Sequence, residues 1–61
     1  MVMDYTAPRY DRGDVVKIKG KALPFKITEV LEEDGKILYL VKQIQEYIVE
    51  DEQIVKLINQ K

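Results

Sequence analysis

The dipeptide Asp34-Gly35 constrains the fold of this chain more than any other feature. It lies between two apolar segments, residues 30–33 and 36–41. Asp-Gly suits the two consecutive positive-φ positions of a type I′ turn, which joins adjacent antiparallel strands. The turn also fixes the register: the expected cross-strand pairs are Glu33 with Lys36, Leu31 with Leu38, and Val30 with Tyr39. The sequence therefore predicts a tight β-hairpin at the centre of the chain.

The aliphatic composition also favours strands. Val and Ile occur seven times each, against five Leu and two Ala. β-branched side chains fit a pleated sheet, whereas Ala and Leu favour helices. With 46% hydrophobic and 34% charged residues, the 61-residue chain is expected to fold as one small domain with a single core.

Alternation of apolar and polar residues predicts two further strands before the hairpin turn. In residues 15–19, Val16 and Ile18 share one face and the lysines at 17 and 19 share the other. The second strand spans 25–32, where Phe25 and Ile27 are in phase but Val30 has the opposite parity. Such a change of phase indicates a bulge or strong coiling. The unbroken apolar run 37–41 predicts a central strand with both faces covered.

The C-terminal third allows two interpretations. In the first, residues 46–49 form a fourth strand, 50–53 a turn and 54–58 a short fifth strand. In the second, apolar residues at helical spacing within 44–58 form one face of a helix packed on a hairpin sheet. The strand interpretation is preferred, because three consecutive acids fall midway and six of the fifteen residues are Val or Ile. The helical interpretation remains the alternative fold.

Several residue types are missing from the sequence, and their absence narrows its chemistry. The chain contains no Cys, His, Trp or Ser. Disulfide scaffolds, zinc fingers and Ser- or Cys-based triads with His therefore have no residues to build them. Carboxylates, Lys and Tyr can transfer protons, but no nucleophile–base pair is recognisable. We expect a non-enzymatic protein without cofactor or metal.

The strand pattern resembles that of small SH3-like barrels, in particular KOW- and Tudor-type modules. The resemblance covers about residues 12–58 and is carried by three segments: Gly13-Asp14-Val15-Val16-Lys17-Ile18, Ile27-Thr28-Glu29-Val30, and residues 47–54, Tyr-Ile-Val-Glu-Asp-Glu-Gln-Ile. It implies an all-β, five-stranded barrel in which a turn of 3₁₀ helix precedes the closing strand. The chain departs from the KOW pattern at Leu23-Pro24-Phe25, where a Gly is expected, so a role in RNA binding is not carried over. Stand-alone proteins of this size and pattern are also common in the genomes of phages and mobile elements.

The predicted organisation is an N-terminal arm, residues 1–12, followed by an SH3-like barrel domain, residues 13–61. Pro8 interrupts the arm, which is expected to be ordered only if Tyr5 or Tyr10 packs into a groove. The net charge of −1 is unevenly distributed: residues 1–26 carry +3 and residues 27–61 carry −4. The sequence shows no signal-peptide h-region and no apolar run long enough to span a membrane, so we expect a cytoplasmic protein without a membrane partner.

The basic half supplies the candidate binding residues. Basic groups neutralise phosphates and aromatic rings stack on bases, so their mixture is typical of single-strand-binding surfaces. The competing interpretation is a solvated face on which lysines prevent edge-to-edge pairing. The candidates are Tyr5, Arg9, Tyr10, Arg12, Lys17, Lys19, Lys21 and Lys26.

The remaining clusters are weaker candidates. Acids at 32–34 and 50–52 lack the alternate spacing and central Gly of a calcium loop, so they are interpreted as solvated turns. Tyr39 and Tyr47, with Phe25, form a candidate groove for a peptide or a cation, although Tyr39 is expected in the core with its hydroxyl at the rim.

Together these observations predict a small non-catalytic module that binds another protein, of phage or mobile-element origin. The alternative is a nucleic-acid-binding barrel that uses the lysine-rich strand face. The charge division between the two halves also permits self-association.

Overall fold

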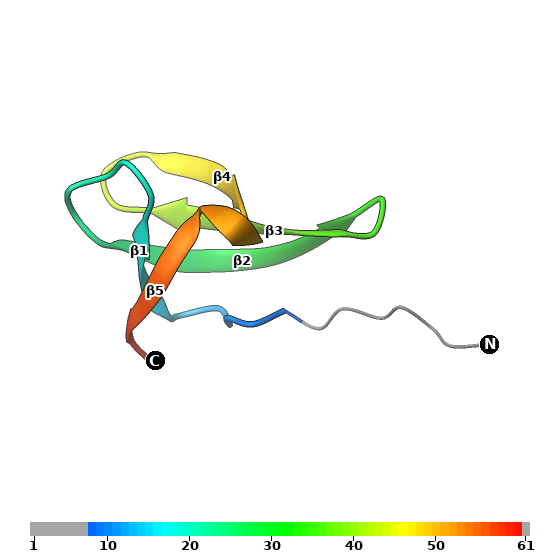
Figure 1. The fold of residues 1–61 in the computed structure, drawn as a ribbon, viewed down its shortest axis with the longest axis horizontal. Helices are drawn as coiled ribbons and strands as arrows, with labels where there is room; N and C mark the ends of the chain where they lie inside the picture. The colour runs from blue at the N-terminus through cyan, green and yellow to red at the C-terminus, as the bar shows by residue number, and fades with distance from the viewer. Residues whose placement is uncertain (1–7, 61) are drawn as a thin grey trace.

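The computed structural model describes residues 8–60 and shows an antiparallel sheet of five strands (Figure 1). No α-helix occurs in the described part of the chain, so the all-β prediction is confirmed and the alternative of a C-terminal helix is wrong. The elements are β1 (Val15–Ile18), β2 (Phe25–Glu33), β3 (Lys36–Lys42), β4 (Glu46–Glu50), a 3₁₀ turn η1 (Asp51–Gln53) and β5 (Ile54–Asn59).

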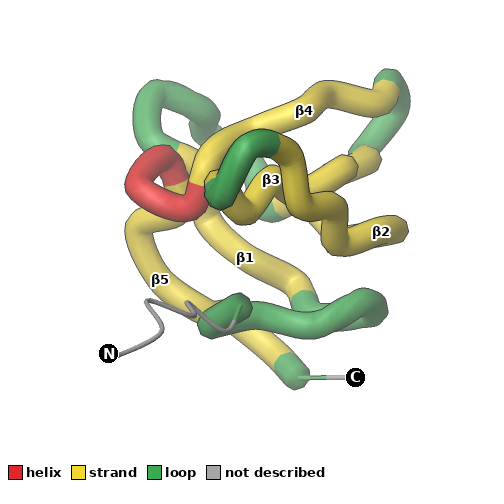
Figure 2. The backbone as a smooth tube through the Cα atoms, turned by 90° about the vertical axis from the view of Figure 1, so that its right-hand side faces the viewer, coloured by secondary structure: helices red, strands yellow, loops and turns green. Residues whose placement is uncertain are grey.

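The strand order is β4-β3-β2-β1-β5, and β4 and β5 are the edges of the sheet in the range described. Strands β2, β3 and β4 form a meander in which sequential neighbours pair. The chain then crosses through η1, so that β5 pairs with β1. Figure 2 shows η1 between β4 and β5, where it redirects the chain. This crossover brings the N-terminal and C-terminal strands side by side.

The central hairpin has the predicted turn and register. Asp34 and Gly35 both have positive φ, 53° and 77°, as a type I′ turn requires. The observed partners are Glu33 with Lys36, Leu31 with Leu38, and Val30 with Tyr39. The predicted hairpin is therefore confirmed in each pair.

The change of apolar phase in β2 is a β-bulge at Thr28. Ile27 pairs with Val41, but the next pair is Glu29 with Leu40, so Thr28 is the extra residue. Its hydroxyl donates a hydrogen bond to the carbonyl of Leu40 at 3.1 Å, which holds the bulge against β3. The bulge places Ile27 and Val30 on the same face although they are three residues apart.

The core occupies one face of the sheet, which we call the inner face. It contains Val16, Ile18, Phe25, Ile27, Tyr39, Val41, Val49 and Ile54. On β3, Tyr39 and Val41 are buried, but Leu38 and Leu40 on the outer face are only half-buried. The expectation that both faces of this strand are covered therefore holds for the inner face, whereas the outer face is only partly covered.

The junction between β4 and β5 is stabilised by a reciprocal capping box. The side chain of Gln53 accepts a hydrogen bond from the backbone N–H of Glu50 at 2.9 Å, and the Glu50 side chain accepts from the backbone of Gln53. The carbonyl of Gln53 also accepts from the N–H of Lys19 at 2.8 Å. These bonds fix the direction in which β5 leaves the turn. No helix within residues 8–60 is long and apolar enough to cross a membrane.

Candidate functional site

The structure divides the predicted binding residues between two separate regions. Arg9 and Tyr10 pack where the N-terminal segment meets β3 and η1. The four predicted lysines lie elsewhere, on β1, on β2 and in the loop between them. Tyr5 lies outside the described residues. A single surface containing the whole predicted set is therefore not formed by residues 8–60.

Arg9 is held by Asp51 of η1. Its guanidinium contacts the carboxylate through Nη2 at 2.9 Å and Nε at 3.0 Å. Its backbone N–H donates a hydrogen bond to the hydroxyl of Tyr39 at 3.2 Å, and that hydroxyl donates to Oδ1 of Asp51 at 3.2 Å. Arg9, Tyr39 and Asp51 thus form one hydrogen-bonded network, in which Arg9 has a structural role.

Tyr10 completes the packing around Tyr39. The two rings meet edge to face, with centroids 5.7 Å apart and an interplanar angle of 74°. The guanidinium of Arg9 also lies over the Tyr10 ring, 5.3 Å from its centre. The rings of Tyr10 and Tyr39 are therefore engaged with each other, and Tyr10 is not displayed as a stacking platform for bases.

This network changes the acidity of its members. Burial raises the pKa of Tyr39 above its ordinary value, and the nearby Asp51 carboxylate raises it further because a phenolate would be repelled. The hydrogen bonds and charge of Asp51 raise the pKa of Arg9. The neutral phenol and the guanidinium cation are the forms that the network stabilises.

The positive charge of Arg12 is partly neutralised by an acidic side chain. Its Nη1 lies 3.4 Å from Oε1 of Glu29 on β2. Both side chains are largely exposed, so the pair is a loose surface contact. Arg12 is therefore less available to an external anion than an uncompensated lysine.

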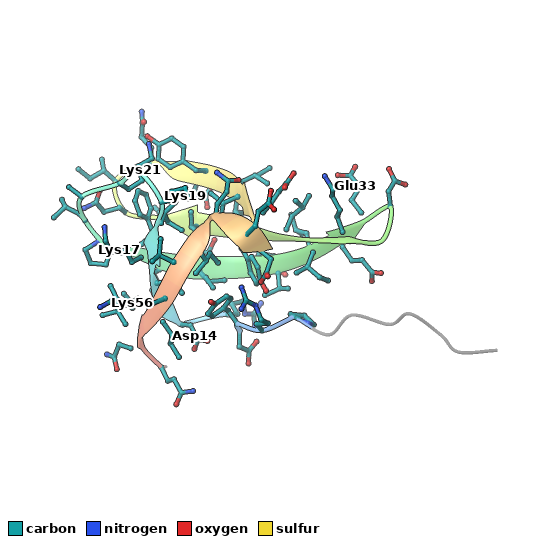
Figure 3. The ribbon with its side chains drawn as sticks, viewed as in Figure 1. Asp14, Lys17, Lys19, Lys21, Glu33 and Lys56 are labelled. Atoms are coloured by element: carbon teal, nitrogen blue, oxygen red, sulfur yellow. The ribbon has the colours of Figure 1, made fainter. Side chains whose placement is uncertain are left out.

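The predicted lysines surround the loop between β1 and β2. Lys17 lies on the outer side of β1, and its Nζ donates a hydrogen bond to the carbonyl of Lys21 at 2.7 Å. Lys21 extends over the Tyr47 ring, with Nζ 4.8 Å from its centre. Lys19 and Lys26 are exposed. Figure 3 shows Lys17, Lys19 and Lys21 grouped at one end of the molecule, with Glu33 near the hairpin turn at the other.

A groove with both apolar and polar lining residues lies between this loop and the loop joining β3 to β4. Phe25 and Tyr47 meet edge to face inside it, with centroids 5.7 Å apart at an angle of 76°. Leu23 and Ile44 also line it and are 57% and 84% exposed. The groove has a volume of about 380 Å³, and its full lining is Lys21, Ala22, Leu23, Phe25, Gln43, Ile44, Gln45 and Tyr47.

The sequence prediction anticipated part of this groove. It paired Tyr47 with Phe25, and these two do meet; Tyr39, the third aromatic residue proposed, is in the core with its hydroxyl at the rim, as expected. The prediction did not include Leu23 and Ile44. The sequence did indicate them, because each is a large aliphatic residue in a segment that is otherwise polar or rich in Gly and Pro, where solvent exposure is expected.

Two exposed lysines were also missed. Lys42 ends β3 and Lys56 lies in β5, and both reach the outer side of the sheet through pairing with strands distant in sequence. Lys56 is labelled beside Lys17 in Figure 3. Only the alternation of Val55, Lys56 and Leu57 indicated that Lys56 faces away from its neighbours.

Comparisons with models of protein families, with curated protein sequences and with solved protein structures found no match to this chain.

Proposed function

We propose that this protein is a non-catalytic module that binds an extended peptide segment of another protein in the groove between residues 19–25 and 42–47, which we call the loop groove. The observation that carries the proposal is the exposure of Leu23 and Ile44 in a groove that also contains two packed aromatic rings. Large apolar side chains gathered at a concave surface are typical of recognition sites.

Charge specifies the chemistry of the peptide. The segments that form the loop groove carry three lysines, Lys19, Lys21 and Lys42, and one acid, Glu46. Complementarity therefore favours a peptide that combines apolar side chains with carboxylates. The apolar groups would occupy the space over Phe25 and Tyr47, and the carboxylates would face the lysines at its margin.

The proposal includes the SH3-like barrel architecture. Two features support it: the bulge in β2 and the 3₁₀ turn η1 that leads into a strand paired with β1. SH3 domains dock extended peptides in grooves lined by aromatic residues. The loop groove shares this feature, since it contains Phe25 and Tyr47.

The test is selection of peptides from a random phage-displayed library on the full chain, followed by ¹⁵N-edited NMR titration. The enriched peptides are expected to share apolar and acidic positions and to shift the amide signals of residues 21–25 and 43–47. A Leu23→Ser/Ile44→Ser variant should bind them at least about tenfold more weakly, as loss of central apolar contacts implies.

Val55→Ser is the matched control, because Val55 is an exposed aliphatic residue on β5 outside the loop groove. It should leave the affinity unchanged. A selection that enriches no common sequence would contradict the proposal. So would peptides that shift signals away from the two loops, or that bind the double variant as tightly as the original protein.

A further inference from the structure

A row of four lysines crosses the outer face of the sheet, with one residue from each of four adjacent strands. Lys42 on β3 lies directly opposite Lys26 on β2. Lys17 on β1 lies directly opposite Lys56 on β5. Lys26 is the partner of Val15, two residues before Lys17, which makes Lys26 and Lys17 diagonal neighbours on the same face. We call these four residues the lysine row.

The charges of the lysine row are not neutralised within the described chain. The ion pairs formed among residues 8–60 use Arg9, Arg12 and Lys36. Lys17 donates to the Lys21 carbonyl, which leaves its charge uncompensated. Glu46 is the cross-strand partner of Lys42, yet the two form no ion pair.

Such an arrangement is unfavourable in the protein alone. Like charges directly opposite each other on paired strands destabilise a sheet, and the row contains two such pairs, Lys42 with Lys26 and Lys17 with Lys56. When a polyanion binds to this face, its attraction to the lysines would outweigh their mutual repulsion. Three consecutive acids, at 32–34, lie at or beside the β2–β3 turn, and Figure 3 shows Glu33 at the far end of the molecule from Lys17 and Lys56, although Asp14 lies near Lys56.

The positions of the aromatic side chains distinguish between classes of nucleic acid. Single-strand-binding surfaces stack bases on exposed rings. Here Tyr10 and Tyr39 pack together, and Phe25 packs with Tyr47 in the loop groove. The lysine row thus offers cations without a stacking platform, which suits a duplex, whose phosphates are outside and whose bases are covered.

We propose that the lysine row binds the phosphate backbone of double-stranded nucleic acid without reading its sequence. Neighbouring strands are about 4.8 Å apart, so the row spans about 14 Å across four strands. The same length of duplex carries about eight phosphate charges. Four lysines are therefore presented to a dense polyanion, and of these only Lys42 also belongs to the segments that form the loop groove.

The test is the salt dependence of binding to a fluorescently labelled duplex of mixed sequence, measured by anisotropy between 20 and 200 mM salt. If all four lysines make contacts, a plot of log Kobs against log salt concentration has a slope of about −3.6. Duplexes of different sequence should give the same affinity and the same slope.

Lys56→Gln and Lys36→Gln form a matched pair of variants, since each removes one exposed charge. Lys56→Gln should weaken binding about tenfold at 50 mM salt and reduce the magnitude of the slope by about 0.9. Lys36→Gln should change neither, because Lys36 lies next to the hairpin turn and is paired with Glu50 at 3.1 Å. The Leu23→Ser/Ile44→Ser variant should retain full duplex affinity, which separates this proposal from that for the loop groove.

Three results would overturn the inference: equal losses in the two lysine variants, a slope near zero, or tighter binding to single-stranded oligothymidine than to duplex. Binding to polyglutamate in preference to duplex would also overturn it and would identify an acidic protein as the partner of the row. Circular dichroism of each variant confirms that the strands are intact before binding is compared.

Discussion

The hydroxyl of Tyr39 donates a hydrogen bond to Oδ1 of Asp51, 12 positions further along the chain, at 3.2 Å. The hydroxyl oxygen of Tyr39 also accepts a hydrogen bond from the backbone N–H of Arg9, again at 3.2 Å. One phenol therefore connects the central strand, the turn η1 and the N-terminal segment. Tyr39 has no solvent exposure, so the chain positions a polar group at the rim of its core and satisfies it from both sides.

Replacement of this phenol isolates the contribution of its hydrogen bonds. Tyr39→Phe keeps the ring contact with Tyr10 but removes the bonds to Asp51 and Arg9. The free energy of unfolding is expected to fall by about 1 kcal/mol, because both former partners are close to solvent. Urea denaturation followed by circular dichroism measures this value, and an unchanged midpoint would show that the network does not stabilise the fold.

The raised pKa of Tyr39 predicts a loss of stability at high pH. The folded protein holds the phenolic proton more tightly than the unfolded chain, so this contribution is complete below the unfolded pKa of about 10. It disappears as the pH rises from that value through the folded pKa. Denaturation midpoints measured from pH 8 to 11 should therefore decline, and the decline should be smaller in Tyr39→Phe. Identical curves for the two proteins would contradict the assignment.

Two isoleucines provide a comparison of buried and exposed side chains. Ile27 has no solvent exposure, whereas Ile44 is 84% exposed beside the loop groove. Ile27→Val is expected to lower the free energy of unfolding by about 1 kcal/mol, and Ile27→Ala by about 2–5 kcal/mol. Ile44→Ala should remain within about 0.5 kcal/mol of the original protein. Thermal unfolding tests the order, and a destabilisation by Ile44→Ala as large as that by Ile27→Ala would show that Ile44 belongs to the core.

The central turn tests the cost of backbone conformation without a change in packing. Gly35 has φ +77°, and a Cβ built there meets no atom within 4 Å. Gly35→Ala should therefore destabilise the protein by about 1 kcal/mol through the left-handed conformation alone. Gly35→Asn should cost less, because Asn tolerates this conformation better. If both substitutions are neutral, the hairpin turn does not retain the type I′ geometry.

Much of the fold was predictable because local chemistry determines it. Asp34-Gly35 specifies its turn, and that turn specifies the hairpin register residue by residue. The bulge at Thr28 was recognisable from the phase difference between Ile27 and Val30. The change from strand to turn to strand after Glu46 followed from the acids at 50–52, which would have interrupted the apolar face of a helix.

The binding surfaces were predictable only in part, because strand pairing distant in sequence creates them. Lys17 and Lys26 were candidates because they lie in the basic N-terminal half of the chain. Lys56 joined them only through the pairing of β5 with β1, and no local pattern specifies that partner. Likewise, the contact between Arg9 and Asp51 depends on the direction in which η1 turns the chain.

The pairing of β1 with β5 has a consequence for how the protein folds. Val16 and Leu57 are partners although they lie about 40 residues apart, so bringing them together requires closure of a long loop with its entropic cost. The hairpins of the β2–β3–β4 meander need only short loops and can form first. The pairing of β1, which carries the buried Val16 and Ile18, with β5 then forms last. Strand β5 is thus expected to dock after the transition state for folding, and substitutions in that strand should accelerate unfolding more than they slow folding.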